Sequence, residues 1–274
     1  MADQRVLITG SAGVVGTFMR TRMARPGRLL RLLDLAEQPP AAPGEPVETI
    51  TASVTDPEAM TAACQGVDAL VHLGGHSRET TWEATLEVNV HGTQVVLDAA
   101  RRAGVPRVLL ASSNHSVGFR RNDEGGPEGL PADSSPRPDT YYGVSKAAIE
   151  ALGSLYHSRF GMDVIAIRIG SCFASPLVLG ARGLQTWLSP RDCARLFEAC
   201  IAAPSPGYRL IWGVSDNTRR VYSLTEARAL GYDPLDNAET YAEQLPEAPA
   251  PTGIAADLIG GPFCTAPLGV ANPL

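Results

Sequence analysis

The chain has 274 residues and a formal net charge of -6, with 44% hydrophobic and 19% charged residues. This composition excludes a disordered chain, and the length fits one large α/β core with a small appendage. The acidic balance argues against a nucleic-acid-binding protein, because affinity for phosphate comes mainly from clustered Lys and Arg.

The N-terminus and the cysteines favour a cytoplasmic protein. We find no signal-peptide pattern and no apolar run long enough to span a bilayer, so no membrane interaction is expected. Five cysteines show no Cys-x-x-Cys spacing and are expected to be reduced thiols: Cys64, Cys172, Cys193, Cys200 and Cys264. No cluster of His, Cys, Asp or Glu has metal-ligand spacing, so no metal site is expected.

Apolar runs of strand length alternate with helical patterns along the chain. The expected strands are 5–9, 29–33, 47–51, 69–73, 107–112, 164–169 and 208–212. Several are apolar almost throughout, which is typical of parallel strands covered on both faces. The alternation predicts right-handed βαβ units and a Rossmann-type, doubly wound parallel sheet. We expect residues 1–169 to form a dinucleotide-binding core. Residues 170–274 should form a smaller substrate-binding region, interleaved with the last core elements.

The first expected strand runs into a G-x-x-G-x-x-G turn made by Gly10, Gly13 and Gly16. Glycines in this position permit a tight turn and let the backbone approach a pyrophosphate. The free N–H groups of the following helix, which begins near Val14 and Val15, then face the phosphates. Because the turn lies between the first strand and the first helix, it predicts a dinucleotide site.

Asp34 ends the second expected strand. A dinucleotide-binding fold places there the carboxylate that binds the adenosine ribose hydroxyls. Such a carboxylate would repel a 2′-phosphate, so Asp34 favours NAD over NADP. After the fourth expected strand, Leu73, Gly74 and Gly75 should pass under the cofactor, and Ser77 should face the site.

A helix is predicted from Thr85 to Ala103, because Gly104 and Pro106 follow it as stop signals. The next strand runs into Ser113, Asn114 and His115 at its carboxyl end, where open α/β sheets bind ligands. The Ser113 hydroxyl could donate to a developing alkoxide or carbonyl. His115 is interpreted as a binding or structural group.

Tyr142 and Lys146 are four residues apart and therefore lie on one face of a helix. A free tyrosine has a pKa of about 10 and is a poor base at neutral pH. A nearby ammonium and a positive nicotinamide ring would lower that pKa. Tyr142 could then take a proton from a substrate hydroxyl while hydride leaves the same carbon. Tyr141 is the competing position, but it meets Ser145 four residues on and gains no cation.

The later part of the chain is richer in Pro and Gly. Ser189 and Pro190 predict the cap and first turn of a helix running to about Ala203. The tail from Pro246 is rich in Pro, Gly and Ala and is predicted to be irregular.

Together these motifs resemble the extended short-chain dehydrogenase/reductase superfamily, also called the NAD-dependent epimerase/dehydratase family. The matching positions are Gly10, Gly13, Gly16, Asp34, Asn89, Ser113, Tyr142 and Lys146. The resemblance implies NAD as the cofactor, with Asn89 supporting the active site from behind. Where relatives often carry an Asp for the adenine, this chain has Ser53, followed by Val54. Adenine recognition is therefore expected to use backbone groups there.

Within this superfamily the chain is more similar to the uronate dehydrogenase family. The segments that carry this resemblance are 71–77, 111–115, 168–172, 182–187 and 230–234. It implies that Arg182 pairs with the carboxylate of a free sugar acid, helped by four other residues: Ser77, Asn114, His115 and Ser171. A guanidinium offers the bidentate hydrogen bonds that suit a planar carboxylate.

These observations predict oxidation of a hexuronate, such as glucuronate or galacturonate, at C1 to the aldarolactone with NAD. Two alternatives stay open. One is a sugar-nucleotide epimerase or dehydratase, against which the short C-terminal half argues. The other is a non-catalytic NAD-binding regulatory protein, since fold alone does not prove chemistry. A small-molecule substrate and a homo-oligomer are the expected partners.

Overall fold

The seven predicted strands form one parallel sheet in the computed structural model, which describes residues 4–245 and 253–271. Their spatial order is β3 (Val47–Thr51), β2 (Arg28–Asp34), β1 (Gln4–Thr9), β4 (Ala69–His72), β5 (Arg107–Ser113), β6 (Asp163–Ile169) and β9 (Tyr208–Gly213). Every neighbouring pair is parallel. The predicted Rossmann-type, doubly wound fold is confirmed.

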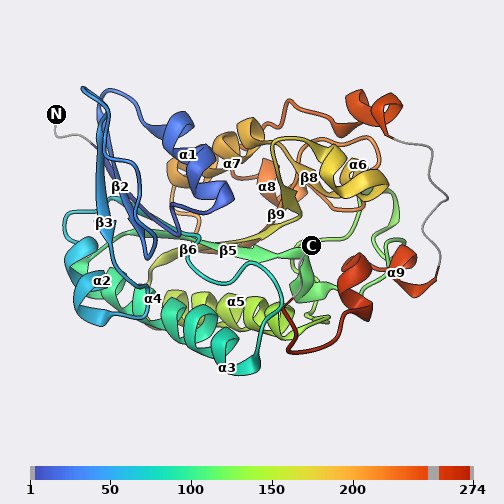
Figure 1. Ribbon diagram of the computed structural model, residues 1–274, viewed down its shortest axis with the longest axis horizontal. Helices are drawn as coiled ribbons and strands as arrows, with labels where there is room; N and C mark the ends of the chain where they lie inside the picture. The colour runs from blue at the N-terminus through green and yellow to red at the C-terminus, as the bar shows by residue number, and fades with distance from the viewer. Residues whose placement is uncertain (1–3, 246–252, 272–274) are drawn as a thin grey trace.

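Helices cover both faces of this sheet (Figure 1). α2 (Pro57–Ala63), α4 (Gly92–Ala103) and α5 (Tyr141–Phe160) lie on one face, and α1 (Val14–Met23) and α7 (Pro190–Ala202) lie on the other. Strand side chains alternate between the faces. Val6 and Ile8 of β1 therefore join the core beside α1 and α7, whereas Leu7 joins the core beside α4 and α5. Burying both faces in this way explains why several strands are apolar almost throughout.

The strand order reverses between β1 and β4. From β1 the chain continues outward to β2 and β3, and then crosses to β4 on the other side. Open α/β sheets bind ligands in the crevice beyond the carboxyl ends of strands at such a point. The fold therefore brings the segments after β1, β4 and β5 to one edge of the sheet.

The prediction of a regular helix from Thr85 to Ala103 is wrong in two respects, namely where the helix begins and whether it is α-helical throughout. It begins earlier, with α3 (Trp82–Thr85), continues through a π-helical stretch (Leu86–His91) and ends as α4 at Ala103. The predicted stop is confirmed, since Gly104 adopts a left-handed φ of 72°. π-helical turns within longer helices are frequent at functional sites. This one contains Asn89.

Short elements make up the rest of the chain. The predicted helix after Ser189 is confirmed as α7, and the Ser189 side chain accepts a hydrogen bond from the Asp192 amide. The other short elements are β7 (Ser171–Cys172), β8 (Trp187–Leu188), α6 (Gly183–Thr186) and α8 (Thr225–Arg228), with 3₁₀ turns at Asn114–Val117, Gly126–Glu128, Pro176–Arg182 and Ala238–Gln244.

The tail from Pro246 was predicted to be irregular. Residues 246–252 and 272–274 lie outside the described residues. Within residues 253–271 the prediction is wrong, because α9 (Ile254–Asp257) and a 3₁₀ turn (Gly261–Thr265) form there. None of the helices in the described part of the chain is long and apolar enough to cross a membrane.

Candidate active site

The glycine turn after β1 is packed too closely for side chains. A Cβ at Gly10 would lie 2.5 Å from the carbonyl carbon of Leu73, and one at Gly16 would lie 2.4 Å from Ser11 Cα. Helix α1 follows at Val14 with Gly13 as its N-cap, and no side chain caps it. The amides of its first turn are therefore open to an external anion. The residues present fit a dinucleotide pyrophosphate.

Asp34 ends β2 beside this turn. Its two carboxylate oxygens accept hydrogen bonds from the amides of Ala12 and Ala36, both at 2.9 Å. These bonds fix the carboxylate next to the glycine turn, the position expected for a group that binds a ribose. The structure thus brings Asp34 and the glycines together.

The segments after β3 and β4 pack against each other beside the glycine turn. A Cβ at Gly74 would come within 2.7 Å of Val54 Cγ1, so the two residues lie in contact. The Ser53 hydroxyl bonds to the Thr55 hydroxyl at 2.8 Å. Leu73 donates from its amide to the Thr9 carbonyl at 3.0 Å, which carries the strand pairing into the turn. The stretch from Leu73 to Gly75 thus lies between Val54 and the glycine turn.

Asn89 lies behind this loop. Its Oδ1 accepts from the His76 amide at 2.7 Å, and its Nδ2 donates to the Ser145 hydroxyl at 2.9 Å. Asn89 is buried, and it joins the loop after β4 to helix α5. Ser77 lies exposed on the loop that Asn89 holds.

Helix α5 brings the predicted catalytic pair together. The Thr140 hydroxyl caps the helix by accepting from the Gly143 amide at 3.0 Å. Tyr142 and Lys146 are buried on one helix face, with Lys146 Nζ 5.3 Å from the centre of the Tyr142 ring. Lys146 Nζ also donates to the Ala111 carbonyl of β5 at 2.8 Å. This bond holds the ammonium at the carboxyl end of the sheet.

Burial dominates the electrostatics of this pair. It raises the pKa of Tyr142 to about 12, although a hydrogen bond with Ser113 acts in the opposite direction. Burial also lowers the pKa of Lys146 to about 8, while the negative charge of Glu150 opposes that shift. The pKa of Tyr142 thus lies above its usual value before a cofactor binds. For Tyr142 to act as a base, the positive charges of Lys146 and of the nicotinamide ring must lower its pKa by more than burial raises it.

Glu79 holds the start of helix α5, and the sequence analysis did not single it out. Its buried carboxylate accepts from the Tyr142 amide at 2.8 Å and from the Gly269 amide at 2.8 Å. A carboxylate at a helix N-terminus is stabilised by the free amides and the helix dipole. Glu79 lies in a loop and belongs to none of the motifs, so the sequence contained no signal for it.

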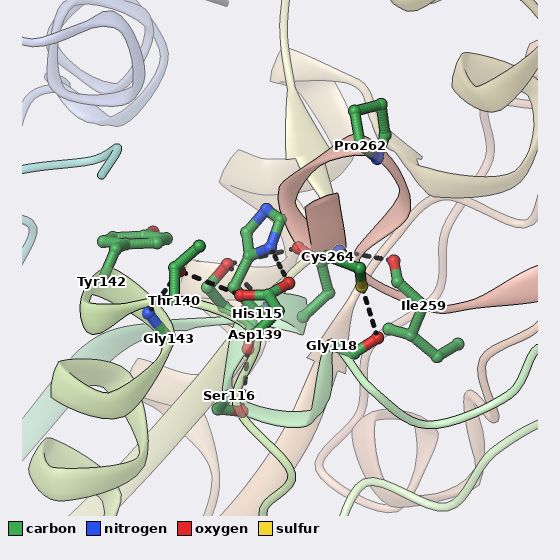
Figure 2. A network of polar contacts seen from close by, with 12 residues as sticks. His115, Ser116, Gly118, Asp139, Thr140, Tyr142, Gly143, Ile259, Pro262 and Cys264 are labelled. Atoms are coloured by element: carbon green, nitrogen blue, oxygen red, sulfur yellow. Dashed lines mark hydrogen bonds and ion pairs between the residues drawn. The ribbon is translucent and has the colours of Figure 1, made fainter. Parts of the chain in front are cut away.

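Asp139 fixes the ring of His115 and was also missed. His115 Nδ1 lies 2.7 Å from Asp139 Oδ2, and the Thr140 hydroxyl donates to Asp139 Oδ1 at 2.9 Å. Figure 2 shows His115 between Tyr142 and residues of the C-terminal segment. The ring lies 5.7 Å from that of Tyr142 and stacks at 4.0 Å on that of Phe263. The His115 ring is therefore held in a fixed orientation beside the candidate base Tyr142.

The side chains of Asn114 and Arg182 both donate to the same backbone carbonyl. Asn114 Nδ2 donates to the Ile259 carbonyl at 3.1 Å, and Arg182 Nη2 donates to the same oxygen. Arg182 forms no ion pair with a carboxylate among residues 4–245 and 253–271. No carboxylate of the described side chains is therefore bonded directly to the guanidinium.

Ser171 is linked to Arg182 through one side chain. The Thr186 hydroxyl bonds to the Ser171 hydroxyl at 3.1 Å and donates to the Arg182 carbonyl at 3.2 Å. Of the five substrate residues that the resemblance implies, Asn114, His115 and Arg182 are thus gathered around the C-terminal segment. Ser171 is joined to Arg182 through Thr186.

The model of the NAD-dependent epimerase/dehydratase family matches residues 6–184. The chain belongs to this family. The match includes the glycine turn, Asp34, the Tyr142–Lys146 pair and Arg182, so the predicted membership of the NAD-dependent epimerase/dehydratase family is confirmed.

Individual members of this family are similar to the chain over nearly its whole length. Uronate dehydrogenase of Pseudomonas putida is 39% identical over 264 residues, which cover 96% of each chain. NAD-dependent glucose-6-phosphate dehydrogenase of Haloferax volcanii is 40% identical and covers 90% of this chain and 100% of its own. The structure of a mutant uronate dehydrogenase from Agrobacterium tumefaciens, complexed with NAD, has a TM-score of 0.89 at 37% identity. It covers 97% of this chain and 98% of that chain. The resemblance to uronate dehydrogenases is thus confirmed.

Proposed function

We propose that this protein oxidises a hexuronate, such as glucuronate or galacturonate, at C1 to the aldarolactone, with NAD as the hydride acceptor. The observation that carries the proposal is the unpaired charge of Arg182 beside Asn114, next in the chain to Ser113 and His115. A guanidinium without a protein carboxylate can bind an anionic group of the substrate. The uronate dehydrogenase relatives support a carboxylate as that group.

The reaction follows from the placement of the catalytic residues. Bound NAD would supply the acceptor for the hydride of C1. Tyr142 takes the proton of the C1 hydroxyl, so the C1–O bond becomes the carbonyl of the lactone. Ser113 donates a hydrogen bond to that oxygen, and Lys146 supplies the positive charge that stabilises the Tyr142 phenolate. Arg182 holds the C6 carboxylate, assisted by Ser77, Asn114, His115 and Ser171.

The same proposal assigns the cofactor site. The glycine turn with Val14 and Val15 would bind the pyrophosphate, and Asp34 would bind the adenosine ribose. Val54 with Ser53 would line the adenine side, while Lys146 would hold the nicotinamide ribose. The cofactor would also be supported by the loop after β4, with Leu73, Gly74 and Gly75, and by Asn89 behind that loop.

Asp34→Ala tests the cofactor assignment. We expect the Kd for NAD to rise by about 10- to 100-fold, since hydrogen bonds to a charged group are lost. Discrimination against NADP should also relax, because the repulsive carboxylate is gone. Both Kd values can be measured by titration calorimetry, with the exposed neighbour Glu37→Ala as control. A wild-type protein that already prefers NADP would contradict the role of Asp34.

The second candidate function is oxidation of a phosphorylated aldose. The relative from Haloferax volcanii favours it, because it is as similar to this chain as the uronate dehydrogenases are. Arg182 could bind a phosphate as well as a carboxylate. A sugar-nucleotide epimerase and a non-catalytic NAD-binding protein receive no comparable support.

A substrate panel separates these functions. Purified protein with NAD is mixed with glucuronate, galacturonate, glucose 6-phosphate or glucose, and NADH absorbance is recorded. We expect kcat/KM to be highest for a uronate. Turnover of glucose 6-phosphate without turnover of either uronate would establish the second candidate in place of the first. No net NADH with any sugar would instead favour an epimerase or a regulatory protein.

We also propose a homo-oligomer in the cytoplasm. Two large apolar side chains of α5, Leu155 and Phe160, are half exposed. Burying such surface against a second copy would be favourable. All five cysteines are free thiols, which suits a reducing compartment. Sedimentation of the purified protein measures the oligomeric state.

A further inference from the structure

Residues 258–269, here called the C-terminal strap, are hydrogen-bonded to the segment that follows β5. The Ile259 amide donates to the Arg120 carbonyl at 2.9 Å, and the Gly260 amide donates to the Gly118 carbonyl at 2.8 Å. The Ile259 side chain is fully buried in the main core. At its far end, the Gly269 amide bonds to the buried carboxylate of Glu79. Hydrogen bonds at both ends therefore fix the position of the strap relative to the segment that follows β5.

The strap contacts three of the substrate residues. The ring of Phe263 stacks on His115, and the Ile259 carbonyl accepts from both Asn114 and Arg182. Figure 2 shows Ile259, Pro262 and Cys264 of the strap on the side of His115 away from Tyr142. The strap is thus one wall of the candidate substrate site.

Gly261 lies directly against the guanidinium of Arg182. A Cβ at this position would come within 2.7 Å of Nη1, 2.8 Å of Cζ and 3.1 Å of Nε. The residue also has a φ of +58°, which favours glycine. Any side chain here would push the guanidinium away, because the flexible end of Arg182 can yield more easily than the strap backbone.

We propose that the strap positions Arg182 for anion recognition, with Gly261 as the surface on which the guanidinium rests and the Ile259 carbonyl as its anchor. A guanidinium has five N–H donors in a fixed plane, so one bond to Ile259 orients the plane and leaves other donors for the substrate. Gly261 is therefore a positioning residue that determines specificity for an acidic sugar. This inference rests on the proposed function, in which Arg182 binds the acid group.

Gly261→Ala is the decisive variant, and Gly253→Ala is its matched control. Gly253 also has a positive φ, +82°, but a Cβ there meets nothing within 4 Å. Both variants therefore carry the backbone cost, and only Gly261→Ala displaces Arg182. We expect Gly261→Ala to lower kcat/KM for the uronate by about 10- to 100-fold, the effect of misplacing a binding group by about 1 Å. The loss should appear mainly in KM, and the Kd for NAD should stay unchanged.

A double-mutant cycle with Arg182→Ala separates positioning from a general structural effect. In the Arg182→Ala background, Gly261→Ala should cause no further loss, since the displaced guanidinium is absent. Additive losses, or an equal loss in Gly253→Ala, would overturn the proposal. If Gly261→Ala folds poorly, Gly261→Asn replaces it, with Gly253→Asn as control, because Asn tolerates positive φ better. A wild-type protein inactive on uronates would instead contradict the proposed function, and the same cycle would then be run with glucose 6-phosphate.

Discussion

Tyr142→Phe should lower kcat by about 10²- to 10⁴-fold, the usual contribution of a positioned acid or base. The substitution removes one oxygen from a buried ring on α5 and leaves the apolar packing of that ring unchanged. Without the hydroxyl, the oxygen proposed to accept the proton of the substrate is absent. The measurement is steady-state NADH production at saturating uronate and NAD.

Tyr141→Phe is the matched control, because it removes the same atom from the neighbouring residue of the same helix. It should keep near-normal kcat, since the Tyr141 ring packs against Trp82 with centroids 5.1 Å apart and is not placed in the catalytic pair. Near-normal turnover in Tyr142→Phe would assign the base elsewhere. His115 is then the first candidate, because Asp139 already orients its ring.

Arg182→Ala should lower kcat/KM for a uronate by about 10²-fold or more, since a charge-assisted, bidentate contact is lost. Arg182→Lys should also be harmful, because lysine keeps the charge but loses the planar fork. A neutral aldose has no carboxylate to lose, so any activity on glucose should hardly change. The Kd for NAD should also stay near its wild-type value.

The measurement is kcat/KM for glucuronate and for glucose in wild type, Arg182→Ala and Arg182→Lys. Arg209→Lys is the control, because Arg209 is an exposed arginine of the edge strand β9. An equal loss for both sugars would indicate that Arg182 stabilises the region without recognising the acid group. The main residue-level support for a sugar acid would then be gone.

The sheet and the cofactor crevice could be predicted from sequence because their signals are local. A buried parallel strand is an apolar run, and a pyrophosphate turn needs glycines at fixed spacing, so β1, Gly10 and Gly16 were all recognisable. The pair of Tyr142 and Lys146 followed from the period of one helix. The irregularity around Asn89 could not be predicted, because a π-helical turn is stabilised by tertiary contacts of its side chains and not by composition.

The missed residues act across long sequence separations. Glu79 bonds to the amides of Tyr142 and Gly269, and Asp139 bonds to His115. A carboxylate in a loop has no periodicity and no fixed spacing from its partners, so its role becomes visible only in the folded chain. The raised pKa of Tyr142 was missed for a related reason, since burial depends on the packing of the whole site.

The contact between Glu79 and Gly269 also bears on the order in which the protein matures during synthesis. Every strand of the sheet precedes the strap in the chain, so the nucleotide crevice can fold while the ribosome is still making residues 258–269. Until those residues emerge, Glu79 has only the helix amides as partners, and Arg182 has neither Ile259 nor Gly261. In a nascent chain or a product of early termination, the Arg182 guanidinium would therefore lack the anchor that the strap provides.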